Sequence, residues 1–201
     1  ARIIGIYLNP EATKWIDHGF EIYIGDQGDP DFWVTILNHI GQFDVLLDDG
    51  GHQSFQQIVT AREAIKHAKK KCIIAIEDTQ TSFMSDFSAH GENTFLNFCK
   101  DSTDILTAKG ASMYPTRMNA PVNNEIIGLF SAVHSIQFYN SLVAFKIDPV
   151  SAINPEVLWN KRDHSPTDFR YHGLNSAETL WPNPFKKEVV TIHGGVANQK
   201  G

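Results

Sequence analysis

Two short apolar stretches that end in acidic residues constrain the fold of this chain most strongly. The first spans residues 43–52 and ends in the motif D-D-G-G-H, and the second spans residues 72–79 and ends in E-D-T. The residues between them, 53–70, have helical spacing. Because a strand, a helix and a strand of these lengths form a right-handed crossover, we predict two parallel strands in one sheet.

The carboxyl ends of parallel strands meet at one edge of a sheet, and neighbouring strands lie about 5 Å apart. Asp48, Asp49, Glu77 and Asp78 should therefore converge on one small volume. Crowded carboxylates repel one another, which raises a pKa or calls for a cation, and an all-oxygen site suits Mg²⁺, Ca²⁺ or Mn²⁺. The alternative is that these acids only solvate the strand ends or cap the helices that follow.

Two features of the first motif favour a functional site over this alternative. Gly50 and Gly51 allow another backbone segment or a ligand to approach closely, because glycine has no side chain. His52 follows the acids directly and is a candidate base.

The two motifs resemble those of metal-dependent S-adenosylmethionine (SAM) O-methyltransferases that modify sugar hydroxyls of macrolides. Rhamnosyl O-methyltransferases and cephalosporin-hydroxylase-like proteins are also similar. The resemblance covers residues 1–148 and implies an α/β fold with a Rossmann-like class I methyltransferase sheet. It also implies Mg²⁺, or another hard divalent cation, bound by Asp49, Glu77 and Asp78, with His52 as the general base.

The implied enzyme is a SAM-dependent O-methyltransferase. Its partner would be a small-molecule hydroxyl acceptor, either a sugar or a glycosylated natural product. The chain begins with a strand at residues 1–8, whereas the family begins with another strand and a glycine-rich loop that holds the methionine end of SAM. No such loop occurs in this sequence. We therefore expect a sheet without the first strand and the glycine-rich loop, and both a fragment and a shortened form stay open.

The resemblance also places four residues near the cofactor. Tyr7 stands where the family has an acid that holds the ribose hydroxyls, although a rim aromatic is the favoured alternative. Asp26 and Gln27 belong to a G-D-Q sequence that is similar to the family's loop near the adenine, but an ordinary turn explains them equally well. Asp48 is counted with the cofactor-binding residues.

The remaining pattern predicts further elements of an α/β sheet. Strands are expected at 20–24, 134–139 and 142–147, and helices at 10–15, 30–40 and 94–106, the last capped by Asn93 or Thr94. Residues 79–87 are expected to form either a loop that covers a substrate or a hydrophobic clasp over the sheet edge, and residues 108–125 a long surface or lid loop. The helix at 53–70 is expected to pack through one face, made of Phe55, Ile58, Val59, Arg62 and Ile65.

Length, charge and composition limit the remaining choices. With 201 residues and 42% hydrophobic content, residues 1–148 can form one methyltransferase-like domain, and 149–201 an irregular extension. The net charge of −6 argues against a nucleic-acid surface, and no apolar stretch is long enough to cross a membrane. Two isolated cysteines, both expected in the core, suit the cytoplasm.

Two other functions stay open at this point. One is a non-catalytic domain that kept the metal and binds a glycan or a protein partner, which the absent glycine-rich loop favours. The other is an oxygenase, which is disfavoured because a non-haem iron site needs two histidines and one carboxylate, whereas this cluster offers acids and one histidine. The sequence also leaves open whether the protein is a homo-oligomer.

Overall fold

The structure is a computed structural model that describes residues 1–88, 93–111 and 124–152. The chain divides into two compact units, Ala1–Leu158 and Trp159–Gly201, and every described residue belongs to the first unit. The extension predicted from residue 149 onward thus falls outside the described residues, apart from 149–152. None of the helices in the described ranges has the length and apolar character that a membrane-spanning helix needs.

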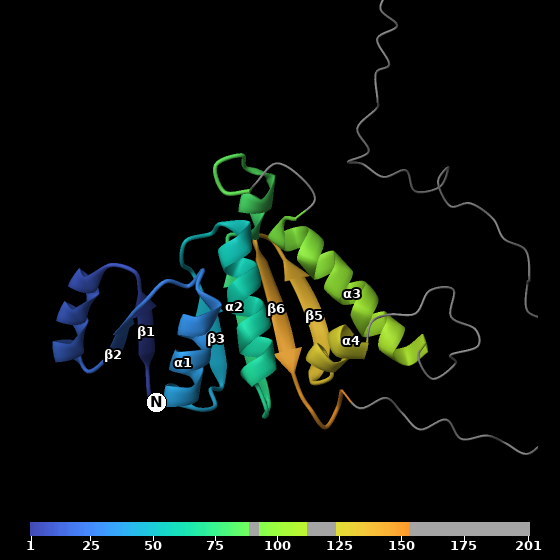
Figure 1. Cartoon of the computed structure of the whole chain (residues 1–201), viewed down its shortest axis with the longest axis horizontal. Coiled ribbons are helices and arrows are strands. Elements are labelled where there is room, and N and C mark those ends of the chain that lie inside the picture. Colours follow the sequence, from blue (N-terminus) through green and yellow to red (C-terminus); the bar gives the residue numbers. More distant parts are fainter. Residues whose placement is uncertain (89–92, 112–123, 153–201) are drawn as a thin grey trace, which may run out of the picture. The chain divides into compact units, whose positions relative to one another are not determined.

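The described residues form an alternating series of strands and helices (Figure 1). In chain order these are β1 (Ile4–Tyr7), the 3₁₀ helix η1 (Pro10–His18), β2 (Glu21–Ile24), α1 (Pro30–Ile40), β3 (Val45–Asp48), α2 (Ser54–His67), β4 (Cys72–Glu77), the 3₁₀ helix η2 (Thr79–Phe83), α3 (Phe95–Ala111), α4 (Asn124–Leu129), β5 (Val133–Tyr139) and β6 (Leu142–Ile147).

Four of the strands form one mixed sheet in the order β3-β4-β6-β5. β3 and β4 are parallel, with Asp48 opposite Ile76, as the crossover through α2 predicts. β6 is antiparallel to both β4 and β5, and Leu142 lies opposite Glu77. The predicted parallel pair and the predicted pair of closing strands are therefore both present.

The other two strands, β1 and β2, form a separate parallel pair. Within the described residues, β1 and β3 each have a strand partner on one side only. Helix α1 bridges the two sheets, because its buried residues pack on Ile6 and Tyr23 of the pair and on Leu46 of β3.

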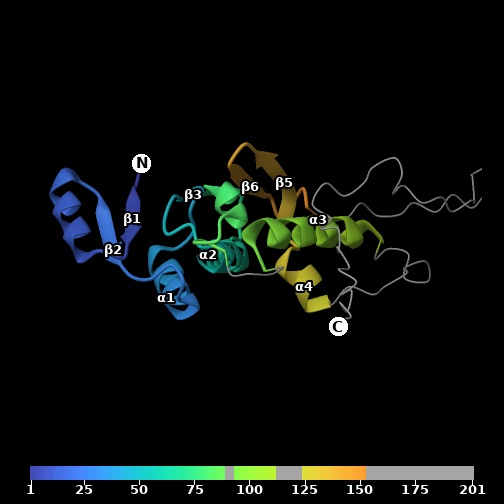
Figure 2. The same ribbon diagram turned by 90° about the horizontal axis from the view of Figure 1, so that it is seen from above.

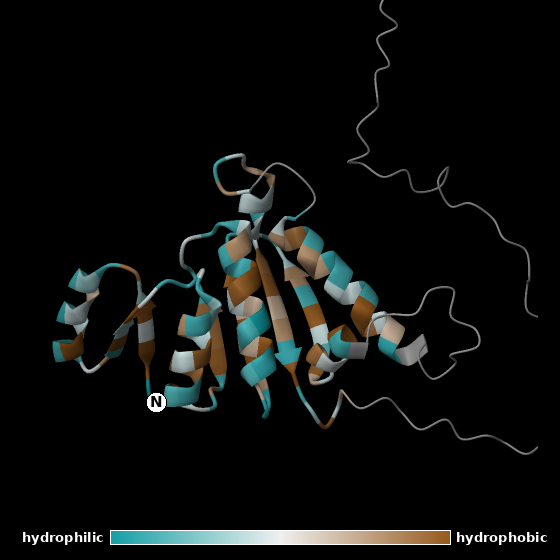
Figure 3. Cartoon of the chain, in the orientation of Figure 1, coloured by the Kyte–Doolittle hydropathy of each residue, from teal (hydrophilic) through white to brown (hydrophobic). Residues whose placement is uncertain are grey.

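The helices cover one face of the four-stranded sheet (Figure 2). On that face Ile74, Ile76 and Phe145 are fully buried against α2 and α3. Hydrophobic and hydrophilic residues follow one another along both helices (Figure 3). The core cluster includes Ala61, Ala64 and Ile65 of α2 and Phe95 and Cys99 of α3. On the opposite face, Val45 and Leu47 are 64% and 58% exposed. The core of the described part thus lies between the sheet and these helices.

The packing face predicted for α2 is partly wrong. Phe55 is 53% exposed, whereas Ile65 is buried and Ile58 and Val59 are partly buried. The fully buried positions include Gln57 and the small residues of the helix, which let α2 approach the sheet closely; they are Gln57, Thr60, Ala61 and Ala64. Apolar spacing alone therefore does not determine the packing face of α2. Small side chains and the hydrogen bond from Gln57 to the backbone carbonyl of Glu77 contribute to it as well.

Helix α3 begins as expected but ends later. Thr94 caps it, because its Oγ1 accepts a hydrogen bond from the Asn97 amide at 3.2 Å. The loop predicted from residue 108 is wrong for 108–111, which continue the helix. Here the buried ammonium of Lys109 donates to the carbonyl oxygens of Phe130 and Ser131, each at 3.1 Å, which ties this end of the helix to the start of β5. Residues 112–123 of the predicted loop lie outside the described residues.

The described core leads to a stability prediction for Phe145, which is fully buried and lies 6.5 Å from the ring of Phe98. Phe145→Ala should lower the free energy of unfolding by about 3–5 kcal/mol, because it leaves a cavity. As a control, Val45→Ala on the exposed face should change it by less than about 0.5 kcal/mol. Urea unfolding measures both, and a loss below about 1 kcal/mol for Phe145→Ala would contradict this packing.

Candidate active site

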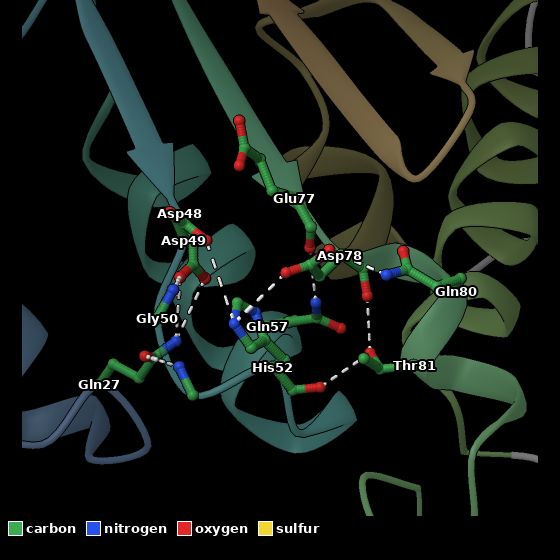
Figure 4. Close-up of polar contacts among 11 residues, drawn as sticks. Gln27, Asp48, Asp49, Gly50, His52, Gln57, Glu77, Asp78, Gln80 and Thr81 are labelled. Atoms are coloured by element: carbon green, nitrogen blue, oxygen red, sulfur yellow. Dashed lines mark hydrogen bonds and ion pairs between the residues drawn. The ribbon is translucent and has the colours of Figure 1, made fainter.

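The candidate site lies where β3 and β4 end, at the carboxyl edge of the parallel pair (Figure 4). The register places Asp48 opposite Ile76, so the turn after β3 and the turn after β4 begin side by side. The first turn carries Asp49 and His52, and the second carries Asp78. This is the edge at which open α/β sheets bind ligands.

Three side chains from these two turns form a compact cluster. The His52 Nε2 atom lies 3.4 Å from Asp78 Oδ2 and 4.0 Å from Asp49 Oδ1. One atom of each residue can be chosen so that all lie within 4.8 Å of one another. The side chains are 24%, 41% and 64% exposed for His52, Asp78 and Asp49, so a ligand can reach them from solvent. Two carboxylates and one imidazole are chemically suited to hold a divalent cation or to accept a proton.

The backbone at two of these residues is unusual. His52 has a φ of 58° and Asp78 a φ of 51°, so both adopt the left-handed conformation that favours glycine. Each such residue costs on the order of 1–3 kcal/mol and persists only where its surroundings fix it. Strained backbone of this kind is common at functional sites, and here it occurs at two members of one cluster.

Gln27 fixes the turn after β3 from the side. Its Nε2 donates to both carboxylate oxygens of Asp48, at 3.1 and 3.2 Å, and its Oε1 accepts the Gly51 amide at 2.7 Å. The Gly50 amide donates to Asp48 Oδ1 at 3.1 Å. Burial raises the pKa of the Asp48 carboxyl, and the hydrogen bonds from Gly50 and Gln27 oppose that rise. Asp48 thus stabilises the turn that carries Asp49 and His52.

The two glycines of the turn let neighbouring side chains approach its backbone closely. A Cβ atom on Gly50 would overlap the Oε1 atom of Gln27 and lie 3.0 Å from Asp48 Oδ1. A Cβ atom on Gly51 would overlap the Oε1 atom of Gln56. The expectation that the glycines allow close approach is therefore met, although the neighbours are side chains of the same chain.

The other predicted site residues lie outside the cluster of Asp49, His52 and Asp78. Glu77 is the last residue of β4, and Figure 4 shows its carboxylate pointing away from Asp78 and His52. Tyr7 ends β1, and Asp26 accepts the Gly28 amide at 2.7 Å in the turn after β2. Their predicted roles stay predictions.

The sequence did not indicate three polar residues that hydrogen-bond to the two turns of the site. Gln57 is fully buried on α2 and donates to the backbone carbonyl of Glu77 at 2.9 Å. Gln80 donates to Asp78 Oδ1 at 2.8 Å. The Thr81 hydroxyl lies within hydrogen-bond distance of the backbone carbonyl oxygens of His52 and Asp78. A glutamine at a buried helical position is a signal that could have indicated Gln57, because buried amides need partners.

No protein-family model matches the chain. The chain is similar in sequence to the mycinamicin VI 2''-O-methyltransferase of Micromonospora griseorubida, with 26% identity over 119 residues, which is 57% of this chain and 30% of that protein. It is similar in structure to the MycE methyltransferase from the mycinamycin biosynthetic pathway in complex with Mg and SAH. That match has a TM-score of 0.64 and 19% identity, and covers 81% of this chain and 41% of MycE.

A further MycE structure, in complex with Mg, SAH and mycinamycin VI, matches with a TM-score of 0.63 and 19% identity over 81% of this chain and 40% of that one. The chain thus spans less than half the length of the relatives it matches. At this identity the structural match shows the fold, and the predicted α/β methyltransferase fold is confirmed. The resemblance to metal-dependent SAM O-methyltransferases that the two acidic motifs predict is confirmed as well.

The contact between Gly50 and Gln27 can be tested by a double-mutant cycle. Gly50→Ala should lower the free energy of unfolding by about 1 kcal/mol, because the new methyl group displaces the Gln27 amide from its hydrogen bonds to Asp48 and Gly51. The loss should shrink by about 0.5 kcal/mol or more when Gln27 is already alanine. Urea unfolding measures the four proteins of the cycle.

Gly128→Ala serves as the control for this cycle. Nothing lies within 4 Å of a Cβ atom at Gly128 in helix α4, so alanine should keep or raise the stability there. If Gly50→Ala costs the same with and without Gln27, the described turn geometry is wrong.

Proposed function

We propose that this protein carries out SAM-dependent methyl transfer to a hydroxyl group of a sugar-bearing small molecule, assisted by Mg²⁺. The observation that carries the proposal is the convergence of Asp49, His52 and Asp78 at the carboxyl edge of two parallel strands. The relatives support it, since one is a 2''-O-methyltransferase and the solved MycE complexes hold Mg and SAH. Because the chain spans less than half of these relatives, the acceptor is proposed only as a chemical class.

Asp49 and Asp78 would hold the cation, and the resemblance adds Glu77 as a third ligand. The donor set fits, because carboxylate oxygens are the ligands that Mg²⁺ prefers, and both residues are open to solvent. A divalent cation bound there lowers the pKa of a hydroxyl that it coordinates and orients that hydroxyl. Whether Glu77 contributes is decided by its own substitution, since its side chain points away from Asp78 in Figure 4.

His52 would act as the general base in the transfer. Its Nε2 lies 3.4 Å from Asp78 Oδ2, so a hydroxyl held by Asp49 and Asp78 would come within reach of the imidazole. The methyl group would leave the sulfonium sulfur of SAM for the acceptor oxygen, with S-adenosylhomocysteine as the leaving group, and His52 would take the proton of the hydroxyl. Catalysis then depends mainly on holding the two reactants in line.

The proposed cofactor residues are Tyr7, Asp26, Gln27 and Asp48. Tyr7 ends β1 opposite Ile24 of β2, so Tyr7 and Asp26 lie near the carboxyl ends of their own parallel pair. Gln27 and Asp48 are hydrogen-bonded to each other beside the cluster. The side chains of Gln27 and Asp48 thus combine support of the turn with the proposed contact to the cofactor.

A second candidate function is a non-catalytic domain that kept the metal site and binds a glycan or a protein partner. The separation of the β1-β2 pair from the four-stranded sheet favours it, because a continuous sheet would hold the cofactor edge more firmly. Association into a homo-oligomer is compatible with either function. A measurement of SAM binding distinguishes the two functions, because a methyltransferase must bind SAM, whereas a non-catalytic domain that kept the metal site need not.

Metal binding gives a direct prediction for the carboxylates. Asp49→Asn and Asp78→Asn should each weaken Mn²⁺ binding by about tenfold or more, since each substitution removes a charged ligand. Both should abolish metal-dependent formation of S-adenosylhomocysteine with a glycosylated macrolide as acceptor. Electron paramagnetic resonance of free Mn²⁺ measures the affinity, and Glu77→Gln, measured alongside, reports on the third ligand.

Asp44→Asn is the matched control for these variants. Asp44 lies just before the amino end of β3, where its Oδ1 accepts a hydrogen bond from Lys70 at 2.8 Å, and its side chain is 88% exposed. Its substitution should leave Mn²⁺ affinity unchanged. Wild-type affinity and turnover in Asp49→Asn or Asp78→Asn would remove the metal from the mechanism.

A further inference from the structure

One buried hydroxyl group contacts both turns that carry the site. Thr81, on η2, is 4% exposed. Its Oγ1 lies 2.9 Å from the backbone carbonyl oxygen of His52 and 2.7 Å from that of Asp78 (Figure 4). The single hydroxyl proton is therefore shared between a residue of the turn after β3 and a residue of the turn after β4.

The two residues that Thr81 contacts are the strained members of the cluster. His52 and Asp78 have φ values of 58° and 51°, conformations that L residues adopt only where neighbouring groups hold them. The Asp78 carbonyl also accepts the backbone amide of Thr81 at 3.1 Å, which closes the first turn of η2. Thr81 thus contacts Asp78 through two donors and reaches across to His52 with its side chain.

Thr81 is itself held in place by other hydroxyl groups. Ser88 Oγ donates to the Thr81 carbonyl at 3.0 Å and lies 3.2 Å from Ser54 Oγ at the start of α2. The Ser54 amide donates to the Phe87 carbonyl at 3.1 Å, which joins α2 to the segment after η2. Ser54 and Thr81 are buried and Ser88 is half-buried, so this network holds the backbone of Thr81 in place.

We propose that Thr81 is a positioning residue whose hydroxyl sets the spacing of His52 and Asp78. The inference rests on the proposed function of the cluster, because that spacing determines whether a cation on Asp78 and a base at His52 can act on one hydroxyl. A backbone contact of this kind acts through the two functional residues, as the outer contacts of metal ligands do. Removing the hydroxyl should let the two strained turns relax apart.

The test compares Thr81→Val, which keeps the shape and removes the hydroxyl, with Thr81→Ser, which keeps the hydroxyl. Thr81→Val should weaken Mn²⁺ binding by about tenfold, while Thr81→Ser stays within about twofold of the wild type. Thr103→Val is the matched control, because it removes a hydroxyl that donates to the Cys99 carbonyl within α3. It should leave Mn²⁺ affinity unchanged.

A second measurement needs no metal. The ¹³Cε1 resonance of His52, assigned with His52→Gln, should shift in Thr81→Val and stay in place in Thr81→Ser and Thr103→Val. If the wild type does not bind Mn²⁺, the proposed metal site is wrong, and the resonance still decides on Thr81. Wild-type Mn²⁺ affinity together with an unshifted resonance in Thr81→Val would overturn the inference.

Circular dichroism checks that each variant is folded. If Thr81→Val does not fold, Thr81→Ala, which removes the hydroxyl without introducing a larger group, takes its place with the same expected results. If neither folds while Thr81→Ser does, Thr81 supports the fold in general and the positioning role is overturned.

Discussion

The parallel hydrogen bonding of β3 and β4 is the constraint on which the candidate site depends. With Asp48 opposite Ile76, β4 ends one residue beyond β3, so the two turns that follow begin close together. A shift of the register by one residue would move Asp49 and Asp78 relative to each other and turn the buried side chains of β4 toward the other face. The buried packing of Ile74 and Ile76 against the helices opposes such a shift.

Side-chain hydrogen bonds then give the two turns their conformation. On one side Gln27, from the loop after β2, holds the glycine turn through Asp48 and Gly51. On the other side Gln80 contacts the Asp78 carboxylate, and Thr81 lies between the two backbones. The strain at His52 can persist because Gln27 and Thr81 hold its turn from elsewhere in the chain, and the strain at Asp78 because Gln80 and Thr81 of the following segment contact it. Function at this edge thus also depends on Gln80 and Thr81, which touch no ligand in the proposed mechanism.

The sequence predicts the parts of this arrangement that follow from local pattern. The apolar runs predict β3 and β4, and the helical spacing between them predicts the crossover and the shared edge. It could not predict the hydrogen bond between Gln27 and Gly51 or the one between Thr81 and His52, because these bonds join residues far apart in the chain and depend on exact side-chain positions. The prediction of the α2 packing face is partly wrong for a related reason. Small and polar residues, Gln57 among them, pack where larger apolar residues are expected.

The most direct test of the account is calorimetric titration of this chain with SAM, first with Mg²⁺ and then with a chelator. The account predicts binding in the micromolar range with Mg²⁺ present, and a separate Mg²⁺ binding signal that Asp78→Asn removes. That result would mean that the described edge forms a working cofactor and metal site despite the separation of the two sheets. A folded chain that binds neither SAM nor Mg²⁺ would contradict it.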